Sequence, residues 1–149
     1  MKIEKANQAD AKEITALTIR SKSHWNYSVE QIESWREELT ITAEYISQNE
    51  VYKLTEEELI GFYAFNKIGE NKVKLFFFFI EPKHIGKGFG KKLMNDFIQR
   101  VKKLGFEKVT VDADPNAEYF YSKSGFKIVG QLPSSIKNRF LPIMELYLK

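Results

Sequence analysis

One stretch decides the fold of this chain: Leu75-Phe76-Phe77-Phe78-Phe79-Ile80-Glu81-Pro82-Lys83-His84-Ile85-Gly86-Lys87-Gly88-Phe89-Gly90-Lys91-Lys92-Leu93. Its apolar beginning predicts a buried strand, its glycines predict a tight turn, and its amphipathic end predicts the start of a helix. Glycine lets the backbone turn sharply, so that several N–H groups can point at one anion. A helix N-terminus adds unpaired donors and a favourable dipole, and the lysines add positive charge. The stretch therefore predicts a pyrophosphate-binding turn.

Length and composition limit the classes of protein that the chain can belong to. Its 149 residues predict one domain over residues 1–149. The absence of cysteine excludes disulfides and a cysteine nucleophile, and two distant histidines predict no metal site. A net charge of +3 with interspersed signs argues against a nucleic-acid partner. No signal region or membrane-length apolar span is found, so the sequence predicts a cytoplasmic protein without a membrane partner.

The spacing of apolar residues predicts alternating helices and strands along the whole chain. Helices are expected at 10–23, 28–39, 42–48, from the glycines to 104, and at 116–123. Strands are expected at 3–5, 51–54, 59–66, 73–80, 109–111, 127–132 and 140–148. Ser28 with Gln31 has the spacing of a capping box, and Pro142 predicts an edge strand or a bulge. This order indicates an α/β domain whose sheet has mixed strand directions.

Other glycine motifs fit the stretch less well. A P-loop needs a second glycine five residues before Gly90 and a Ser or Thr after Lys91, and neither is present. In a Rossmann fingerprint the third glycine comes one residue later than Gly90, although Asp112 lies roughly where a ribose-binding acid is expected. A nucleotide-cofactor enzyme therefore remains an alternative. A purely structural turn would not need three glycines alternating with lysines.

The segment from Glu81 to Leu93 resembles the acetyl-CoA-binding motif of the GNAT acetyltransferase superfamily, written Arg/Gln-x-x-Gly-x-Gly/Ala, with Ile85 at the Arg/Gln position. Asn116-Ala117 and the segment from Phe120 to Phe126 are similar to a second block of that family. The resemblance implies a GNAT fold, with a mixed, mostly antiparallel central sheet flanked by helices. It also implies acetyl-CoA as co-substrate.

The same resemblance implies roles for particular residues. The expected cofactor-binding residues are Phe79, Ile80, Ile85, Gly86, Lys87, Gly88, Phe89, Gly90, Lys91, Asn116, Phe120 and Lys123. By this resemblance, Tyr121 matches the family's general acid. A phenol suits this role because it can protonate a leaving thiolate of similar basicity. Asn116 is also a candidate N-cap. Glu81 is a candidate general base. His24, His84 and deprotonation of the amine through water are the alternatives.

The acceptor side is expected to involve Trp25, Tyr27, Ser134 and Arg139. Because the chain has no cysteine, direct attack of a primary amine in a ternary complex is the predicted route. The expected acceptor is the amine of a small molecule or a peptide. A metabolite, an antibiotic, a peptide N-terminus and a protein lysine are all candidates. An acyl-CoA-binding sensor without transferase activity is the alternative function. A monomer and a homodimer are both compatible with the sequence.

Overall fold

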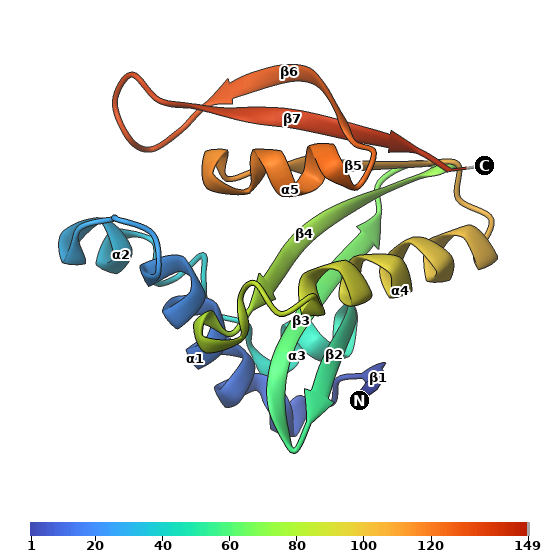
Figure 1. Ribbon diagram of the computed structural model, residues 1–149, viewed down its shortest axis with the longest axis horizontal. Coiled ribbons are helices and arrows are strands. Elements are labelled where there is room, and N and C mark those ends of the chain that lie inside the picture. The colour runs from blue at the N-terminus through green and yellow to red at the C-terminus, as the bar shows by residue number, and fades with distance from the viewer. Residues whose placement is uncertain (149) are drawn as a thin grey trace. The chain divides into compact units, whose positions relative to one another are not determined.

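The computed structural model describes residues 1–148 and divides into two compact units. The first unit contains Met1–Ala64 and Phe77–Leu93, and the second contains Phe65–Phe76 and the chain from Met94 onward. Figure 1 shows the elements in chain order. The helices are η1 (Gln8–Asp10), α1 (Ala11–Ser23), α2 (Val29–Ser34), α3 (Ala43–Gln48), η2 (Pro82–His84), α4 (Phe89–Lys103), η3 (Pro115–Ala117) and α5 (Glu118–Lys123). The strands are β1 (Lys2–Lys5), β2 (Glu50–Glu56), β3 (Glu58–Lys67), β4 (Lys72–Ile80), β5 (Lys108–Asp112), β6 (Lys127–Pro133) and β7 (Phe140–Tyr147).

The strands form one seven-stranded sheet in the order β1-β2-β3-β4-β5-β7-β6. β1 pairs antiparallel with β2, β7 pairs antiparallel with β5 and β6, and β4 pairs parallel with β5. The predicted α/β class with a mixed, mostly antiparallel sheet is therefore confirmed. Such a sheet is not the parallel, doubly wound sheet of a Rossmann fold. The ribose-binding role considered for Asp112 is accordingly wrong, and its carboxylate instead pairs with Lys74 at 2.8 Å.

The core of the first unit lies between α1, α3 and the inner strands. Ile14 and Leu17 are fully buried on one face of α1, as the helical spacing predicts. The ring of Phe62 on β3 stacks on those of Phe77 and Phe79 on β4, with centroids 6.3 and 6.1 Å apart. These aromatic contacts hold the last residues of β4 against β3.

One glycine lets β3 and β4 approach closely within the same unit. A Cβ at Gly61 would lie 2.7 Å from the carbonyl oxygen of Phe79 and 2.7 Å from Cδ1 of Ile80. Such distances are far below ordinary contact, so no larger residue fits without moving β4. Gly61 therefore sets the position of the strand end that precedes the glycine turn.

The helix predicted over 28–39 ends earlier than expected. Ser28 caps it as predicted, with its side chain accepting from the Gln31 N–H, but α2 ends at Ser34. The amides of Trp35 and Arg36 donate to carbonyls three residues back, so the α-helical hydrogen-bond ladder stops there. Trp35 and Leu39 are buried all the same, which explains why their spacing imitates a longer helix.

Pro142 does not lie on an edge strand, because β7 runs between β5 and β6. Its carbonyl accepts from the Ala113 N–H, just beyond the last β5–β7 pair at Asp112 and Ile143. In a strand the N–H and C=O of one residue point to the same side, so the proline nitrogen faces the end of β5 rather than β6. An irregularity does lie nearby, as a register shift in β6 between Ile128 and Gly130.

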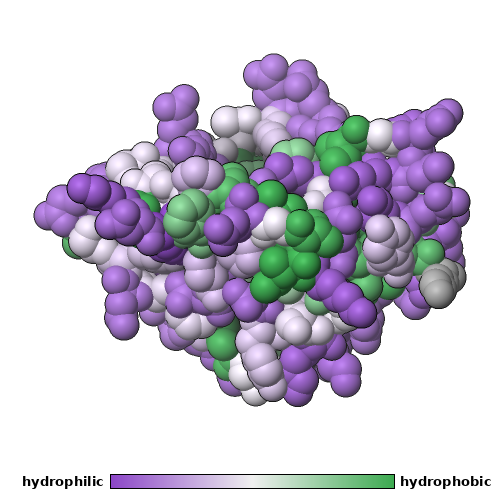
Figure 2. All heavy atoms as spheres, turned by 90° about the horizontal axis from the view of Figure 1, so that it is seen from above, coloured by the Kyte–Doolittle hydropathy of each residue, from purple (hydrophilic) through white to green (hydrophobic). Residues whose placement is uncertain are grey.

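The surface is mostly hydrophilic, with separate apolar areas on the face shown in Figure 2. In the second unit, exposed apolar side chains on β6 and β7 include Ile128, Val129 and Phe140. No helix in the described part of the chain has both the length and the apolar character needed to cross a membrane.

Candidate active site

The predicted turn lies between the end of β4 and the start of α4, in the segment Phe77–Leu93 of the first unit. Gly86 and Gly88 both have φ of +86°, a left-handed conformation that other residues rarely adopt. A Cβ at either position would meet nothing within 4 Å. The glycines are therefore needed for the backbone path of an open, exposed turn and not for internal packing.

Positive charge surrounds this turn without local compensation. Lys87 and Lys91 are exposed, and neither pairs with an acidic side chain among residues 1–148. Lys92 lies over the ring of Phe89 at 5.6 Å, and the first turn of α4 carries no acidic residue. A helix N-terminus of this kind stabilises an anion. The residues present thus fit a pyrophosphate group, and Ile85, whose N–H donates to Pro82, adds no charge of its own.

The strand residues expected to hold the cofactor, Phe79 and Ile80, are both half-buried. The ring of Phe79 packs against those of Phe62 and Phe77, at the margin of the core. Ile80 is half-buried beside Gly61. In the second unit the parallel ladder pairs Lys72–Lys74 with residues 108–110 and extends no further along the described strands. Leu75 and Phe76, the next β4 residues of that unit, are thus outside the β4–β5 register of Lys72, Val73 and Lys74 with Lys108, Val109 and Thr110.

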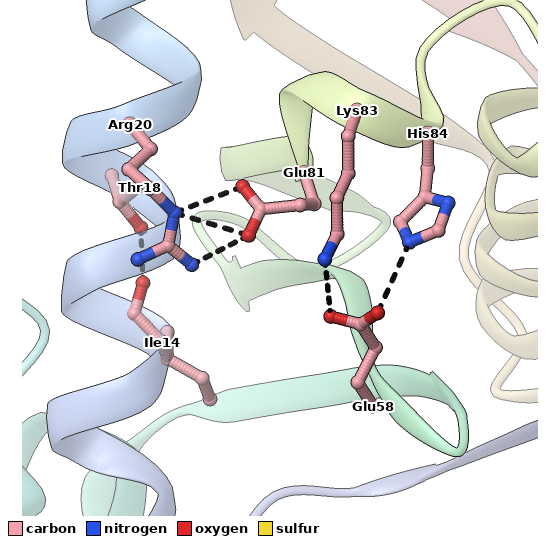
Figure 3. A network of polar contacts seen from close by, with 7 residues as sticks. All are labelled: Ile14, Thr18, Arg20, Glu58, Glu81, Lys83 and His84. Carbon is pink, nitrogen blue, oxygen red and sulfur yellow. Dashed lines mark hydrogen bonds and ion pairs between the residues drawn. The ribbon is translucent and has the colours of Figure 1, made fainter.

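Glu81 immediately follows β4 and is buried, in contrast to the solvated glutamate common at a strand end. Its carboxylate accepts hydrogen bonds from the guanidinium of Arg20 on α1, with Nη2 2.6 Å from Oε1 and Nε 3.0 Å from each oxygen (Figure 3). This hydrogen bond raises the pKa of Arg20, so the guanidinium stays charged. Sequence reasoning missed Arg20, because no local pattern links residues 61 positions apart.

A second polar cluster holds η2, which leads into the turn. Glu58, at the start of β3, pairs with Lys83 at 2.9 Å and lies 3.7 Å from Nε2 of His84 (Figure 3). The Lys83 hydrogen bond lowers the pKa of Glu58. The His84 ring packs edge-on against Phe89, and its buried nitrogens have no hydrogen-bond partner in the described chain. His84 therefore supports the start of α4 from inside the unit.

The aromatic residues between α1 and α2 form their own cluster in the first unit. Tyr27 packs edge-on against Trp35 at 4.8 Å, and the Lys22 ammonium lies over both rings. Trp25 is 36% exposed and packs against the exposed His24. Tyr27 is thus part of a packed corner, while Trp25 presents surface to solvent.

Tyr121 lies on α5 in the second unit, where its ring is buried between Phe120 and Phe126. Burial, and secondly the charge of Asp114, raise the pKa of its hydroxyl. The phenol is therefore protonated at any physiological pH, which is the state that a general acid needs. Lys123, in the last turn of the same helix, lies over the exposed Tyr119 ring.

Asp114 organises the other predicted residues of the second unit. It is the N-cap of η3, which corrects the expectation that Asn116 fills this position, because its Oδ1 accepts from the Asn116 N–H at 2.8 Å. The same oxygen accepts from the Asn116 side chain at 3.0 Å and from Arg139 at 3.4 Å. The structure thus brings Asn116 and Arg139 together at one carboxylate. Ser134 is used inside its loop, where its hydroxyl accepts from the Ile136 N–H.

No group of three or more potential metal ligands is found among the described residues. A half-buried strand end, a glycine turn with positive φ and a helix N-terminus without acidic residues are features that fit a class of protein that binds a phosphate-bearing cofactor. Comparison with known proteins identifies the family within that class.

The family model described as "Acetyltransferase (GNAT) domain" matches residues 4–146. This chain belongs to the GNAT acetyltransferase family. YvbK, an uncharacterized N-acetyltransferase of Bacillus subtilis, is 30% identical over 92 residues, and the match spans 59% of each chain.

Solved structures share the fold over nearly the whole chain. The PaiA N-acetyltransferase of Thermoplasma acidophilum, in complex with coenzyme A, is 26% identical with a TM-score of 0.81 and 98% of each chain covered. A GCN5-related N-acetyltransferase of Rhodopseudomonas palustris is 22% identical with a TM-score of 0.81, covering 99% of this chain and 95% of its own. The second likeness concerns the fold alone.

Proposed function

We propose that this protein is an N-acetyltransferase that takes an acetyl group from acetyl-CoA and transfers it to a primary amine. The observation that carries the proposal is the open turn of Gly86 and Gly88 between β4 and α4, with its unpaired lysines, in a chain of the GNAT family. The coenzyme A complex of PaiA, a relative over its whole length, supports it.

In this proposal the main chain from Ile85 to Lys91 binds the pyrophosphate. Lys87 and Lys91 supply the charge that an Arg at position 85 would bring. The main chain at Phe79 and Ile80 binds the pantetheine arm, and Asn116, Phe120 and Lys123 keep their expected cofactor-binding roles. The acceptor is a small-molecule or peptide amine, with Trp25, Tyr27, Ser134 and Arg139 as its proposed contacts.

The chemistry is acetyl transfer by direct attack, since no cysteine is present to carry an acyl group. The amine nitrogen bonds to the carbonyl carbon as the carbon–sulfur bond breaks. Glu81, directly or through a water molecule, receives the proton that the amine loses. Tyr121 gives its proton to the leaving thiolate, and both roles follow general acid–base catalysis.

The first test is calorimetric titration of the protein with acetyl-CoA, NAD and ATP, followed by an amine panel in which release of free CoA is measured. We expect binding of acetyl-CoA alone and turnover with at least one class of amine. Binding without turnover on any amine would instead favour the sensor function. Binding of NAD or ATP in place of acetyl-CoA would contradict the assignment of the turn.

Replacing Tyr121 with Phe tests the proposed acid. We expect kcat to fall about 10²-fold, because the leaving thiolate loses its proton donor. The dissociation constant of CoA should stay unchanged, since the ring and its packing remain. Tyr119→Phe, on the exposed face of the same helix, is the matched control. Equal turnover in Tyr121→Phe and wild type would remove Tyr121 as the acid.

A further inference from the structure

We infer that Arg20 is a positioning residue that acts through Glu81, and that it leaves one acceptor position on Glu81 Oε2 for the proton donor. The donor is the N–H of the acceptor amine or a bridging water. This inference rests on the proposed function, in which Glu81 receives the proton. Arg20 itself touches neither substrate in this role.

The hydrogen-bond geometry shows which positions on the carboxylate are taken. An ionised carboxylate has about four lone-pair positions, two on each oxygen. The Nη2–H of Arg20 donates to Oε1 at 2.6 Å, and its single Nε–H is shared between Oε1 and Oε2 at 3.0 Å from each. Oε1 therefore takes most of the hydrogen bonding from Arg20, and Oε2, which receives only a share of one N–H, retains an acceptor position.

The burial of the pair explains why the carboxylate depends on Arg20. The Glu81 side chain is only 10% exposed, whereas that of Arg20 is 53% exposed. A carboxylate with so little water needs hydrogen-bond donors from the protein to hold one orientation. The guanidinium supplies a rigid fork of donors, which a lysine ammonium does not reproduce.

The main chain at Glu81 is held independently of Arg20. The Glu81 N–H donates to the Ile60 carbonyl at 2.8 Å, and the Glu81 carbonyl accepts from the His84 N–H at 2.9 Å. Strand β4 and the turn therefore keep their path when Arg20 is replaced, while the Glu81 carboxylate loses its orientation. This separation predicts an effect on turnover and not on cofactor binding.

The experiment compares Arg20→Gln, Arg20→Lys, Glu81→Gln and the double variant Arg20→Gln/Glu81→Gln. We expect Glu81→Gln to lower kcat about 10²-fold and Arg20→Gln to lower it at least tenfold. The double variant should be no slower than Glu81→Gln, because Arg20 has no role once the carboxylate is gone. Arg20→Lys should recover part of the loss, and every variant should bind CoA as wild type does.

Arg36→Gln is the matched control, since it breaks an arginine–glutamate pair that is exposed and joins Arg36 to Glu33. It should leave kcat unchanged. Wild-type kcat in Arg20→Gln, or losses that multiply in the double variant, would overturn the inference while the transferase function stands. Full activity of Glu81→Gln would remove the role of Glu81 and the inference with it. Absence of turnover in wild type on every amine would instead reject the proposed function.

Discussion

At the scale of single residues, the backbone conformation of the turn carries the proposed function. Gly88 holds φ of +86° in open space, so a substitution acts on the backbone and not through a steric clash. Its neighbours Lys87 and Lys91 give the turn its charge. The turn combines glycine conformation with cationic side chains, and both features are testable separately.

Replacing Gly88 with Ala should weaken CoA binding about tenfold, because a left-handed conformation costs a non-glycine residue roughly 1–2 kcal/mol. Gly88→Asp should abolish binding, since it also brings a negative charge to the pyrophosphate position. Calorimetry measures both. Gly69→Ala is the control, because its Cβ would make only an ordinary contact at 3.8 Å. Unchanged affinity in Gly88→Asp would contradict the location of the cofactor.

The partly buried hydroxyl of Tyr45 should make the stability of the folded protein depend on pH in the alkaline range. Burial raises the pKa of its hydroxyl to about 12, whereas the unfolded chain titrates near pKa ~10. The unfolded state therefore loses this proton first, so the group's contribution to stability is complete below pH ~10 and is lost as pH rises toward 12. Denaturant unfolding between pH 9 and 12 should show this loss in wild type and a smaller one in Tyr45→Phe, which keeps the packing on Phe77. An identical pH dependence in the two proteins would exclude Tyr45 as its source.

At the scale of elements, the approach of β3 to β4 decides where the strand end and Glu81 lie. The aromatic contacts of Phe62 hold β4 on one side, and Gly61 permits the approach by lacking a side chain. Arg20 then ties α1 to the residue that follows β4. The position of Glu81 is thus a property of three elements packed together.

Replacing Gly61 with Ala should destabilise the protein by about 1–3 kcal/mol, because the new methyl group overlaps the Phe79 carbonyl. Urea unfolding measures the loss. Gly130→Ala, whose Cβ would lie 3.6 Å from Ile143 Cδ1, should change the unfolding free energy far less. A Gly61→Ala protein as stable as wild type would show that β4 can shift without cost.

At the scale of the whole molecule, binding of the cofactor is expected to stabilise the folded chain, since the turn exists only in the native state. Acetyl-CoA at 100 times its dissociation constant should raise the free energy of unfolding by about 2.7 kcal/mol. Thermal unfolding with and without acetyl-CoA measures the shift. Gly88→Asp should show none, and an equal shift in that variant would place the ligand elsewhere.

Much of the fold was predictable because its signals are local. The glycine turn, the amphipathic helix after it and the Ser28 cap each depend on residues within a few positions of one another. The strands were found for the same reason, to within one or two residues. The end of α2 was not, because buried Trp35 and Leu39 continue a helical spacing through turns whose hydrogen bonds are no longer a regular α-helical ladder.

By itself, the sequence determined the order of elements, the glycine turn before α4 and the family, since short motifs and apolar periodicity specify these through neighbouring residues. Only the tertiary structure decided that Glu81 is buried and held by Arg20, that Asp114 and not Asn116 caps η3, and that Pro142 lies on an inner strand. The physical reason is that burial and ion pairing depend on which distant segments pack together, and no local pattern records that.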